Sequence, residues 1–470
     1  MEAPATQRPP GVGRVVADLR EERSERPRLP PGEQSFSLLR THRFQRDTLR
    51  TTLAYRERYG DVFTVRMFHR PVVVMLGPAA NHFVTVSGAE NFSWREGMFG
   101  EHLIPLIGDG LITTDWEYHD RARRIMMPAF HRARMDSAVA VMAEETERAL
   151  AGWRDGETVD LYHWVRDLSM SIAMRALVGL DPERAHAAAE AFERALAFYD
   201  TETWLMLLRG PGSPWWRLQK ARADLDRILY EEIARRRRRS DAEEPAGMDA
   251  LSMLMEARDE HGEGFTDREL RDQVAHLLFG GHDTSSSTVS FLAYELARHP
   301  DVAARVREES GAVLGERAPT VDELMTSLPQ LDLAVDETLR LYPPVWFGPR
   351  RSVRDFEFDG HRIPAKTHIH YSSWVSHRLP DVFGEPDEFI PERFTPEARQ
   401  ALPKGAYIPF GGGRRICIGK RFGQLVVKTV AATLARRFEW RLAPGYELTV
   451  DKLPTLSPRG GLPVVPRSRG

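Results

Sequence analysis

A ten-residue segment near the C-terminus, from Phe410 to Gly419, places the strongest constraint on how this chain folds. It reads Phe-Gly-Gly-Gly-Arg-Arg-Ile-Cys-Ile-Gly, and Cys417 is the only cysteine among the 470 residues. Glycines let the main chain bend tightly and approach a flat ligand closely. Arg415 adds positive charge, which favours the ionised form of the sulfur. The segment therefore predicts a tight loop that presents one thiolate, held by backbone amides, as a metal ligand.

The spacing Phe-x-x-Gly-x-Arg-x-Cys-x-Gly resembles the haem-binding signature of the cytochrome P-450 family. Further motifs follow in the family's order, so the resemblance extends from about residue 28 to about residue 460. It implies the cytochrome P-450 fold, which is mainly α with a small β region. It also implies haem b as the cofactor, with Cys417 as the axial ligand of its iron. The other residues of the segment that we expect to contact the haem are Phe410, Gly413, Arg415 and Gly419.

The composition excludes several classes of protein. A formal net charge of −3 gives no indication of a nucleic-acid-binding protein. A single cysteine cannot form an internal disulfide or a multi-thiolate zinc or iron–sulfur site. The N-terminus is rich in Pro, Arg and Glu and has no apolar run that could span a membrane. We therefore expect a cytoplasmic bacterial protein in which residues 1–27 are disordered and residues 28–470 form one domain.

Two parts of the chain are expected to form β-structure. Residues 62–67 and 72–76 are β-branched runs on either side of a turn, so the part from about 60 to 76 predicts a hairpin. A second β-rich part is expected over 350–371, with Asp359-Gly360 as its turn. Helical patterns dominate between these two parts.

A long helix is predicted from Thr266 to His299. Thr266 and Glu269 have the spacing of a capping box, and apolar residues recur at helical spacing up to His299-Pro300. Gly280 and Gly281 lie in the middle of this helix, where each costs about 1 kcal/mol relative to alanine. We expect the two glycines to leave room beside the helix for a ligand such as O2.

Asp283 and Thr284 follow these glycines and resemble the acid–alcohol pair of the family. In that family a hydroxyl group close to the bound oxygen and a carboxylate behind it deliver protons from solvent. A plain helix–helix contact, in which glycine allows close approach, would also explain this spacing. Taken with the cysteine motif, the pattern leads us to interpret Asp283, Thr284 and Cys417 as the catalytic residues.

Glu337 and Arg340 lie one turn apart on a predicted helix that ends at Pro343. Such pairs are usually superficial, but the apolar residues around this one suggest that it is buried. A buried ion pair needs further partners to offset its desolvation. The segment 391–394 resembles the family segment whose arginine, here Arg393, joins the pair. We expect this structural triad to fix the position of the cysteine loop.

The two propionate groups of a buried haem require neutralising partners. His119 and Arg123 lie four residues apart near the start of a helix and resemble the family's propionate-binding pair. Arg415 is a further candidate. Because side chains alternate along a strand, one of Arg350 and Arg351 is expected to face the haem and the other to face away. We favour Arg350, without excluding Arg351.

The expected substrate pocket is apolar. Phe99 belongs to an apolar, aromatic segment that the resemblance places over the haem, and Val345 and Phe347 also approach the pocket in relatives. Gly280 and Gly281 complete its predicted wall. Ordinary core packing would explain many of these residues equally well.

The resemblance also implies that electrons come from NAD(P)H through a separate ferredoxin or flavodoxin. Basic residues near the cysteine provide a surface that suits an acidic partner. They are Lys404, Arg414, Lys420 and Arg421, which Arg124 and Arg132 could extend.

We therefore expect a haem-thiolate monooxygenase that inserts one oxygen atom from O2 into an apolar small molecule. A fatty acid, a terpenoid or a similar hydrophobic metabolite would fit. The alternative is a non-catalytic haem-thiolate sensor, in which Asp283 and Thr284 would have no function. A haem-free cysteine phosphatase is disfavoured, because Gly423 stands where that loop needs an arginine.

Overall fold

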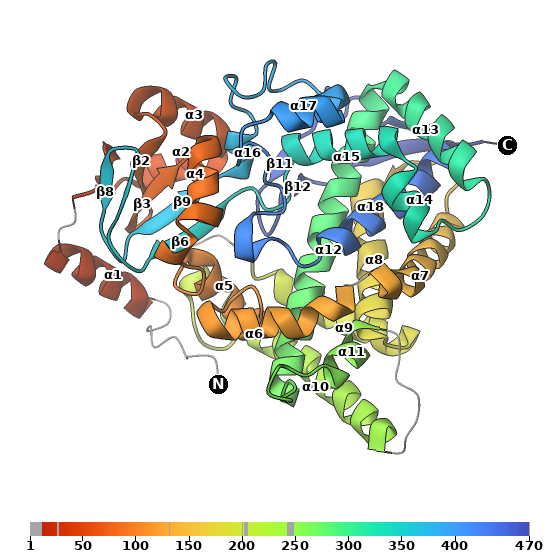
Figure 1. Cartoon of the computed structure of the whole chain (residues 1–470), viewed down its shortest axis with the longest axis horizontal. Helices are drawn as coiled ribbons and strands as arrows, with labels where there is room; N and C mark the ends of the chain where they lie inside the picture. The colour runs from red at the N-terminus through yellow and green to blue at the C-terminus, as the bar shows by residue number, and fades with distance from the viewer. Residues whose placement is uncertain are drawn as a thin grey trace.

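The computed structural model of the chain describes residues 12–25, 28–130, 132–199, 201, 205–241 and 249–469. The described part is mainly helical, and the long helix α12 (Asp267–Arg298) runs through its middle (Figure 1). The larger sheet and the N-terminal helices lie on one side of α12, and most of the other helices lie on the other side. This architecture confirms the mainly α fold with a small β region.

Helices of very different lengths make up most of the structure. Those before α12 are α1 (Val12–Glu25), α2 (Leu38–Arg46), α3 (Thr48–Tyr59), α4 (Gly77–His82), α5 (Met98–Ile107), α6 (Trp116–Met126), α7 (Arg132–Leu150), α8 (Leu161–Ala173), α9 (Pro182–Leu196), α10 (Pro214–Asp241) and α11 (Ala250–Glu256). Those after it are α13 (Pro300–Leu314), α14 (Val321–Thr326), α15 (Pro329–Leu341), α16 (Ser373–Ser376), α17 (Pro396–Ala401) and α18 (Lys420–Arg437). Short 3-10 or π turns are η1 (Phe83–Ser87), η2 (Ala89–Asn91), η3 (Met127–Phe130), η4 (Met174–Val178), η5 (Leu205–Leu207), η6 (Pro391–Phe394) and η7 (Gly413–Arg415). Among the described residues, none of these helices combines the length and the apolar character needed to span a bilayer.

The ends of α12 follow from local chemistry. The hydroxyl of Thr266 accepts the N–H of Glu269 at 3.2 Å, and the Glu269 carboxylate accepts the N–H of Thr266 at 2.9 Å. This capping box satisfies backbone donors that the first turn leaves without partners. At the other end, Pro300 starts α13, because it cannot continue the hydrogen-bonding pattern of α12. Most residues of α12 are buried, since α8, α10, α15 and α18 all pack against it.

The larger sheet has six strands in the order β1-β2-β3-β9-β6-β4. The strands of the chain are β1 (Gly32–Glu33), β2 (Val62–Met67), β3 (Arg70–Met75), β4 (Phe92–Ser93), β5 (Val159–Asp160), β6 (Gly348–Ser352), β7 (Phe356–Phe358), β8 (His361–Ile363), β9 (His368–Tyr371), β10 (Phe438–Leu442), β11 (Val450–Asp451), β12 (Ser457–Pro458) and β13 (Pro463–Ser468). β9 runs parallel to β3 and antiparallel to β6, which fixes the register of Arg350 opposite Ile369. Both β-rich parts expected from the sequence contain strands, and β6 and β9 join the first hairpin in one sheet, whereas β7 and β8 pair with each other in a separate hairpin.

This sheet joins residues that are far apart in the sequence, and so does a second one. The three-stranded sheet β10-β13-β5 pairs Val159 with Val464. The largest apolar core lies among the helices around α12, and two smaller cores lie beside the strands of the six-stranded sheet. The six-stranded sheet joins residues 32–75 to residues 348–371, and the three-stranded sheet joins residues 159–160 to residues 438–468. We therefore interpret residues 28–470 as one domain.

The N-terminal helix α1 differs from the expectation that residues 1–27 are disordered. Its Asp18 accepts a hydrogen bond from Nε of Arg70 at 2.5 Å, and its Glu21 pairs with Arg351 at 3.0 Å. The segment contains no proline between residues 12 and 25, and its acidic side chains meet arginines that the sheet holds nearly buried. Tertiary ion pairs therefore order a polar segment whose composition alone indicated disorder. The rest of 1–27 lies outside the described residues.

Candidate active site

A cavity of about 1330 Å³ lies between the large sheet and α12. The Cys417 loop forms one wall, Gly280 and Thr284 of α12 form another, and Phe347 and Arg350 lie on the sheet side. Pockets for a single small ligand usually measure about 300 to 1,000 Å³. The cavity therefore has room for a large cofactor and a substrate together.

The cysteine loop needs its glycines for conformation and close packing. Gly413 has φ of 59°, and a Cβ there would lie 2.3 Å from the backbone oxygen of Thr85. The Cys417 N–H donates to the Phe410 oxygen at 2.9 Å, which closes the loop. Phe410 and Gly419 line the cavity. Gly413, which we also expected to contact the cofactor, instead packs behind the cavity wall against η1.

The sulfur of Cys417 is accessible from the cavity but surrounded by protein. Burial raises the pKa of the thiol, while a hydrogen bond from the Gly419 N–H and the charges of Arg123 and Lys420 act to lower it. Arg415, to which the sequence motif attributes this electrostatic effect, is not among the groups that lower the pKa of the thiol. In the structure Arg123 from α6 and Lys420 from α18 supply it, because the fold brings both close to the sulfur.

Arg415 and His119 meet at the end of the cavity near α6. The Arg415 guanidinium binds the Thr114 oxygen and the Asp115 carboxylate, and burial lowers its pKa to about 10. His119 is buried with Nδ1 3.2 Å from the Asp120 carboxylate. Burial and the charge of Arg415 lower the pKa of His119 to about 4, so its imidazole is neutral at pH 7. His119 is thus suited to hydrogen bonding rather than to charge neutralisation.

Arg350 and Arg351 point to opposite sides of β6. Arg350 lines the cavity, its guanidinium lies 3.6 Å from the ring centre of Trp94, and Nη2 lies 3.4 Å from the hydroxyl of Tyr371. Arg351 instead pairs with Glu21 of α1. The strand alternation therefore places Arg350 toward the cavity, which is the alternative that the sequence favoured.

The charges around the cavity fit a haem with two propionates. Arg350 is 3% exposed, and burial lowers its pKa, yet no carboxylate among the described residues lies within ion-pair distance. Arg123 is half-buried with the same lack of a carboxylate partner among the described residues. A buried guanidinium is stable only with a compensating anion. A dianionic cofactor beside Cys417 would supply that anion, so this set of residues fits haem.

The α12 wall of the cavity is open at its glycines. A Cβ on Gly280 would meet no atom within 4 Å, and one on Gly281 would lie 3.5 Å from Cδ1 of Leu177. Both glycines line the cavity. Thr284, one turn after Gly280, also lines it and donates from Oγ1 to the Gly280 oxygen at 2.6 Å. The glycines therefore leave space on the face where the threonine hydroxyl lies.

Asp283 lies behind this wall, between α12 and α8. Its Oδ1 is 3.2 Å from Nε of Arg166 and 3.3 Å from Nδ1 of His282. Nε2 of His282 lies 3.3 Å from Glu193 of α9, whose carboxylate is 38% exposed and whose pKa burial raises. No local pattern indicated Arg166 or Glu193, because they come from other helices. His282, the residue before Asp283, is buried between the carboxylates of Asp283 and Glu193.

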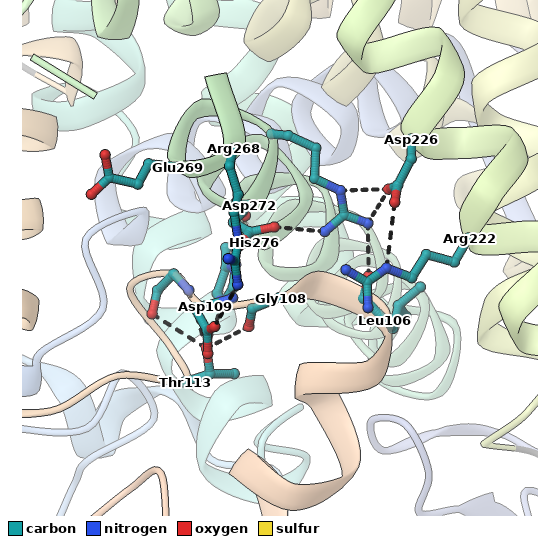
Figure 2. A network of polar contacts seen from close by, with 12 residues as sticks. Leu106, Gly108, Asp109, Thr113, Arg222, Asp226, Arg268, Glu269, Asp272 and His276 are labelled. Atoms are coloured by element: carbon teal, nitrogen blue, oxygen red, sulfur yellow. Dashed lines mark hydrogen bonds and ion pairs between the residues drawn. The ribbon is translucent and has the colours of Figure 1, made fainter. Parts of the chain in front are cut away.

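A polar network fixes the segment that leads from α5 to α6, and Figure 2 shows Asp226 of α10 and Asp272 of α12 within it. The fully buried guanidinium of Arg271 binds Asp226, lies 2.9 Å from Asp272 and donates to the Leu106 oxygen at 3.0 Å. Asp272 also accepts the Asp109 N–H at 2.9 Å. The network joins α5, α10 and α12, and no sequence motif had indicated it.

Two glycines make this attachment sterically feasible. A Cβ on Gly108 would lie 2.2 Å from Asp272, and one on Gly110 would lie 2.4 Å from His276. Nδ1 of His276 lies 2.6 Å from the backbone oxygen of Asp272, and Nε2 of His276 lies 3.2 Å from the hydroxyl of Thr113 (Figure 2). Burial lowers the pKa of His276 to about 3. The loop over the cavity is therefore held by a neutral histidine and by close backbone packing.

Glu337, Arg340 and Arg393 come together as the sequence motifs indicate. The Glu337 carboxylate binds Nε of Arg340 at 2.7 Å, and its other oxygen lies 3.4 Å from Nε of Arg393 and accepts the Ile390 N–H at 2.9 Å. Glu337 and Arg340 are 0% exposed. Arg340 also donates to the backbone oxygens of His377, Pro386 and Glu388. Every strong donor and acceptor of the pair is thus engaged, as burial of charge requires.

A short chain of hydrogen bonds links this triad to the cysteine loop. Nη1 of Arg340 donates to the His377 oxygen at 2.9 Å, and Nε2 of His377 accepts the N–H of Ile408 at 3.0 Å. Ile408 lies two residues before Phe410. The triad is therefore coupled to the start of the loop through one buried histidine.

The expected substrate-pocket residues lie in the cavity wall where the structure describes them. Val345 and Phe347 line the cavity, together with Leu103, Phe198 and Phe279. The side chain of Phe99 lies outside the described residues. The wall above the cysteine loop is thus largely apolar, with aromatic rings from several elements.

The predicted basic surface is partly neutralised within the protein. Arg414 is 77% exposed but pairs with Asp120, and Arg124 pairs with Glu260 at 2.7 Å. Lys404 is exposed, whereas Lys420 and Arg421 are half-buried. The side chain of Arg132 lies outside the described residues. The surface beside the cysteine loop therefore remains basic around Lys404, Lys420 and Arg421.

Comparison with known proteins agrees with this geometry. The family model described as "Cytochrome P450" matches residues 27–459. Cyclooctatin synthase of Streptomyces melanosporofaciens is 32% identical over 423 residues, which cover 87% of this chain and 89% of that protein. Cyclooctat-9-en-7-ol 5-monooxygenase of the same organism is 34% identical over 351 residues, which cover 73% and 75% of the two chains.

Solved structures share the whole fold. The structure of retinoic acid-bound cyanobacterial CYP120A1 superposes with a TM-score of 0.83 at 30% identity, covering 94% of this chain and 99% of that chain. The haem domain of cytochrome P450DA superposes with a TM-score of 0.84 at 25% identity, covering 94% and 97%.

Proposed function

Because the chain belongs to the cytochrome P450 family, it is a haem b-dependent monooxygenase, and we propose that its substrate is an apolar isoprenoid molecule. The observation that carries this proposal is the aromatic-lined cavity above the Cys417 loop. One similar protein is named cyclooctatin synthase, and one similar structure is described as bound to retinoic acid, which is an isoprenoid. Aromatic rings that come from several elements suit the larger faces of a branched or cyclic isoprenoid better than a single straight chain.

Haem, when bound, supplies the activation of O2, which no amino-acid side chain provides. Cys417 is proposed to hold its iron through the sulfur. Arg123, Arg350 and Arg415 are proposed to neutralise the propionates, and His119 to donate an N–H to one of them. Each of these side chains lines the cavity.

The residues of α12 are proposed to deliver protons to the cavity and to leave room in it for a ligand. Thr284 lines the cavity with its hydroxyl group, whose proton bonds to the Gly280 oxygen, and the missing Cβ of Gly280 leaves room beside it. Asp283 lies behind Thr284 and is reached from the surface past Glu193 and His282. Apolar residues around the cavity exclude bulk water from the substrate.

An acidic electron-transfer protein is the proposed redox partner. The basic surface beside the cysteine loop suits a negatively charged partner and speeds its encounter. Lys404→Glu should slow reduction by a surrogate ferredoxin several-fold at low salt and less at high salt, with haem content unchanged, because Lys404 is exposed. Lys220→Glu, on α10, is the matched control. Equal reduction rates for Lys404→Glu and the wild type would contradict this surface.

A ligand panel tests the substrate class. Geranylgeraniol, retinoic acid, palmitic acid and a steroid are titrated into the haem-loaded protein, and dissociation constants are measured by calorimetry and by absorbance. We expect at least one isoprenoid to bind about tenfold tighter than palmitic acid. Tighter binding of the straight-chain acid than of every isoprenoid would reject the proposed class.

A further inference from the structure

His370 is a buried histidine in the cavity wall whose imidazole makes no hydrogen bond among the described residues. It lies on β9, opposite Pro349 of β6 and Val74 of β3, and is 5% exposed. It lines the cavity. Nε2 is packed within the protein without a hydrogen-bond partner, and Nδ1 likewise makes no hydrogen bond among the described residues. The ring of Phe347 lies 5.2 Å away, centre to centre.

Other buried histidines of the chain have a structural partner. Nδ1 of His276 lies 2.6 Å from the backbone oxygen of Asp272, and Nε2 of His377 accepts the N–H of Ile408. A buried polar group without a partner typically costs about 1 to 3 kcal/mol. No hydrogen bond among the described residues compensates this cost for the His370 imidazole, so its partner must come from the cavity that the ring lines.

The chemical state of the imidazole suits a neutral hydrogen-bonding role. Burial and the charge of Arg350 lower the pKa of His370 to about 3, so the ring is uncharged at pH 7. A neutral imidazole offers one N–H donor and one acceptor nitrogen. It can therefore bond to a hydroxyl or a carboxyl oxygen without bringing a charge into the apolar cavity.

Neighbouring polar side chains on this wall are already engaged. The hydroxyl of Ser372 donates to the Trp346 oxygen at 2.8 Å, and that of Ser373 donates to the Val345 oxygen at 2.9 Å. Ser285 of α12 is a second cavity-lining group whose Oγ has no partner among the described residues. It lies on the opposite, α12 side and so offers a competing location that an experiment can separate.

We propose that His370 binds an oxygen atom of the substrate, a hydroxyl or carboxyl group on an otherwise apolar molecule. This inference rests on the proposed function and deepens it, because it specifies an isoprenoid that already carries oxygen when it enters. The reaction that supplies the substrate must then be one that leaves a hydroxyl or carboxyl group on the carbon skeleton.

The test compares His370→Phe, His370→Gln and Ser285→Ala in the haem-loaded protein. Calorimetry measures dissociation constants for geranylgeraniol, the matching carboxylic acid and the matching C20 hydrocarbon. We expect the wild type to favour one oxygenated probe over the hydrocarbon by about tenfold, the value of one hydrogen bond. His370→Phe should abolish that preference and leave hydrocarbon binding unchanged, His370→Gln should retain part of it, and Ser285→Ala should retain it.

A second readout does not depend on any ligand. The melting temperature of His370→Phe should equal or exceed that of the wild type, because the change removes an unsatisfied buried polar group. An unchanged preference in His370→Phe, an equal loss for all three probes, or a lower melting temperature would each overturn the proposal. If Ser285→Ala alone abolishes the preference, the oxygen site lies on α12 and the proposal is wrong.

Different results would reject the isoprenoid substrate class and the oxygen site at His370. If the wild type binds none of the C20 probes, the isoprenoid class is rejected, and the same variants are compared with 1-hexadecanol and hexadecane. A preference for the alcohol that depends on His370 would then support the oxygen site without the isoprenoid class. A preference that is independent of His370 would reject the site.

Discussion

Asp283 and Thr284 are adjacent in sequence, yet they face different surroundings. Thr284 lines the cavity, whereas the Asp283 carboxylate lies 3.2 Å from Arg166 behind α12. Successive residues of a helix point about 100° apart, so one residue can face the cavity while the next faces a neighbouring helix. The pair thus spans the helix from its protein-packed side to its cavity side.

Replacing the two residues separately should reveal different steps of proton delivery. We expect Asp283→Asn to lower the rate of product formation about a hundredfold, the usual size of general-acid catalysis, with an increased solvent deuterium effect. Thr284→Val should lower the product formed per NADPH consumed and raise the peroxide formed. Ser286→Ala is the control, because Ser286 is buried and bonds to the His282 oxygen. Wild-type coupling in Thr284→Val would contradict the assignment.

The buried Glu337 should be required for stability. Glu337→Ala leaves the fully buried Arg340 without its carboxylate, and loss of one partner of such a pair costs about 3 to 5 kcal/mol. Urea unfolding and the rate of haem loss measure the effect. Glu392→Ala, which removes an exposed ion pair with Arg305, should cost under about 1 kcal/mol. Comparable losses in the two variants would show that burial does not decide the contribution.

Glycine at position 280 should lower the stability of α12 and leave space for a ligand in the cavity. A Cβ at Gly280 meets no atom within 4 Å, so Gly280→Ala should stabilise α12 by about 1 kcal/mol. It should also weaken ligand binding, because the added methyl group projects from the cavity wall. Gly311→Ala in α13, which likewise meets no atom within 4 Å, should stabilise the protein without changing ligand affinity. Unchanged ligand affinity in Gly280→Ala would argue against a role of the glycine in leaving space.

The buried His276 predicts a loss of stability in acid. Its pKa falls from 6.5 in the unfolded chain to about 3 in the folded protein, so between these values the unfolded state binds more protons. Its contribution is fully present above pH 6.5 and is lost as the pH falls, by about 1.4 kcal/mol per pH unit. We expect His276→Gln to flatten the dependence of the unfolding free energy on pH between 6.5 and 5. His261→Gln, at an exposed histidine, should leave the slope as in the wild type.

Local sequence patterns predicted the elements that local chemistry specifies. The capping box at Thr266 and the proline at Pro300 set the bounds of α12, because both act within a few residues. The alternation of β6 favoured Arg350 as the arginine facing the cavity, since neighbouring side chains on a strand point to opposite faces. The motif around Cys417 is also local, because its residues lie within ten positions of one another, and it was sufficient to indicate the family.

Other assignments required partners from distant parts of the chain. The composition of residues 1–27 indicated disorder, but Asp18 and Glu21 order α1 through arginines more than 50 residues away. Arg415 was expected to favour the thiolate, whereas Arg123 and Lys420 have that effect. No spacing pattern in the sequence predicts the Arg271 network or the position of His282 between Asp283 and Glu193, because both depend on how separate helices pack.

The sequence by itself determined the cysteine loop, the long helix with its glycines and the carboxylate–hydroxyl pair, because glycine conformations, helix caps and residue spacing act locally. The tertiary structure decided which charges surround the sulfur, how far Asp283 lies from the cavity, and that His370 faces it without a partner among the described residues. Electrostatic shifts and unsatisfied hydrogen bonds depend on burial and on distances between elements. Those quantities exist only after the chain has packed.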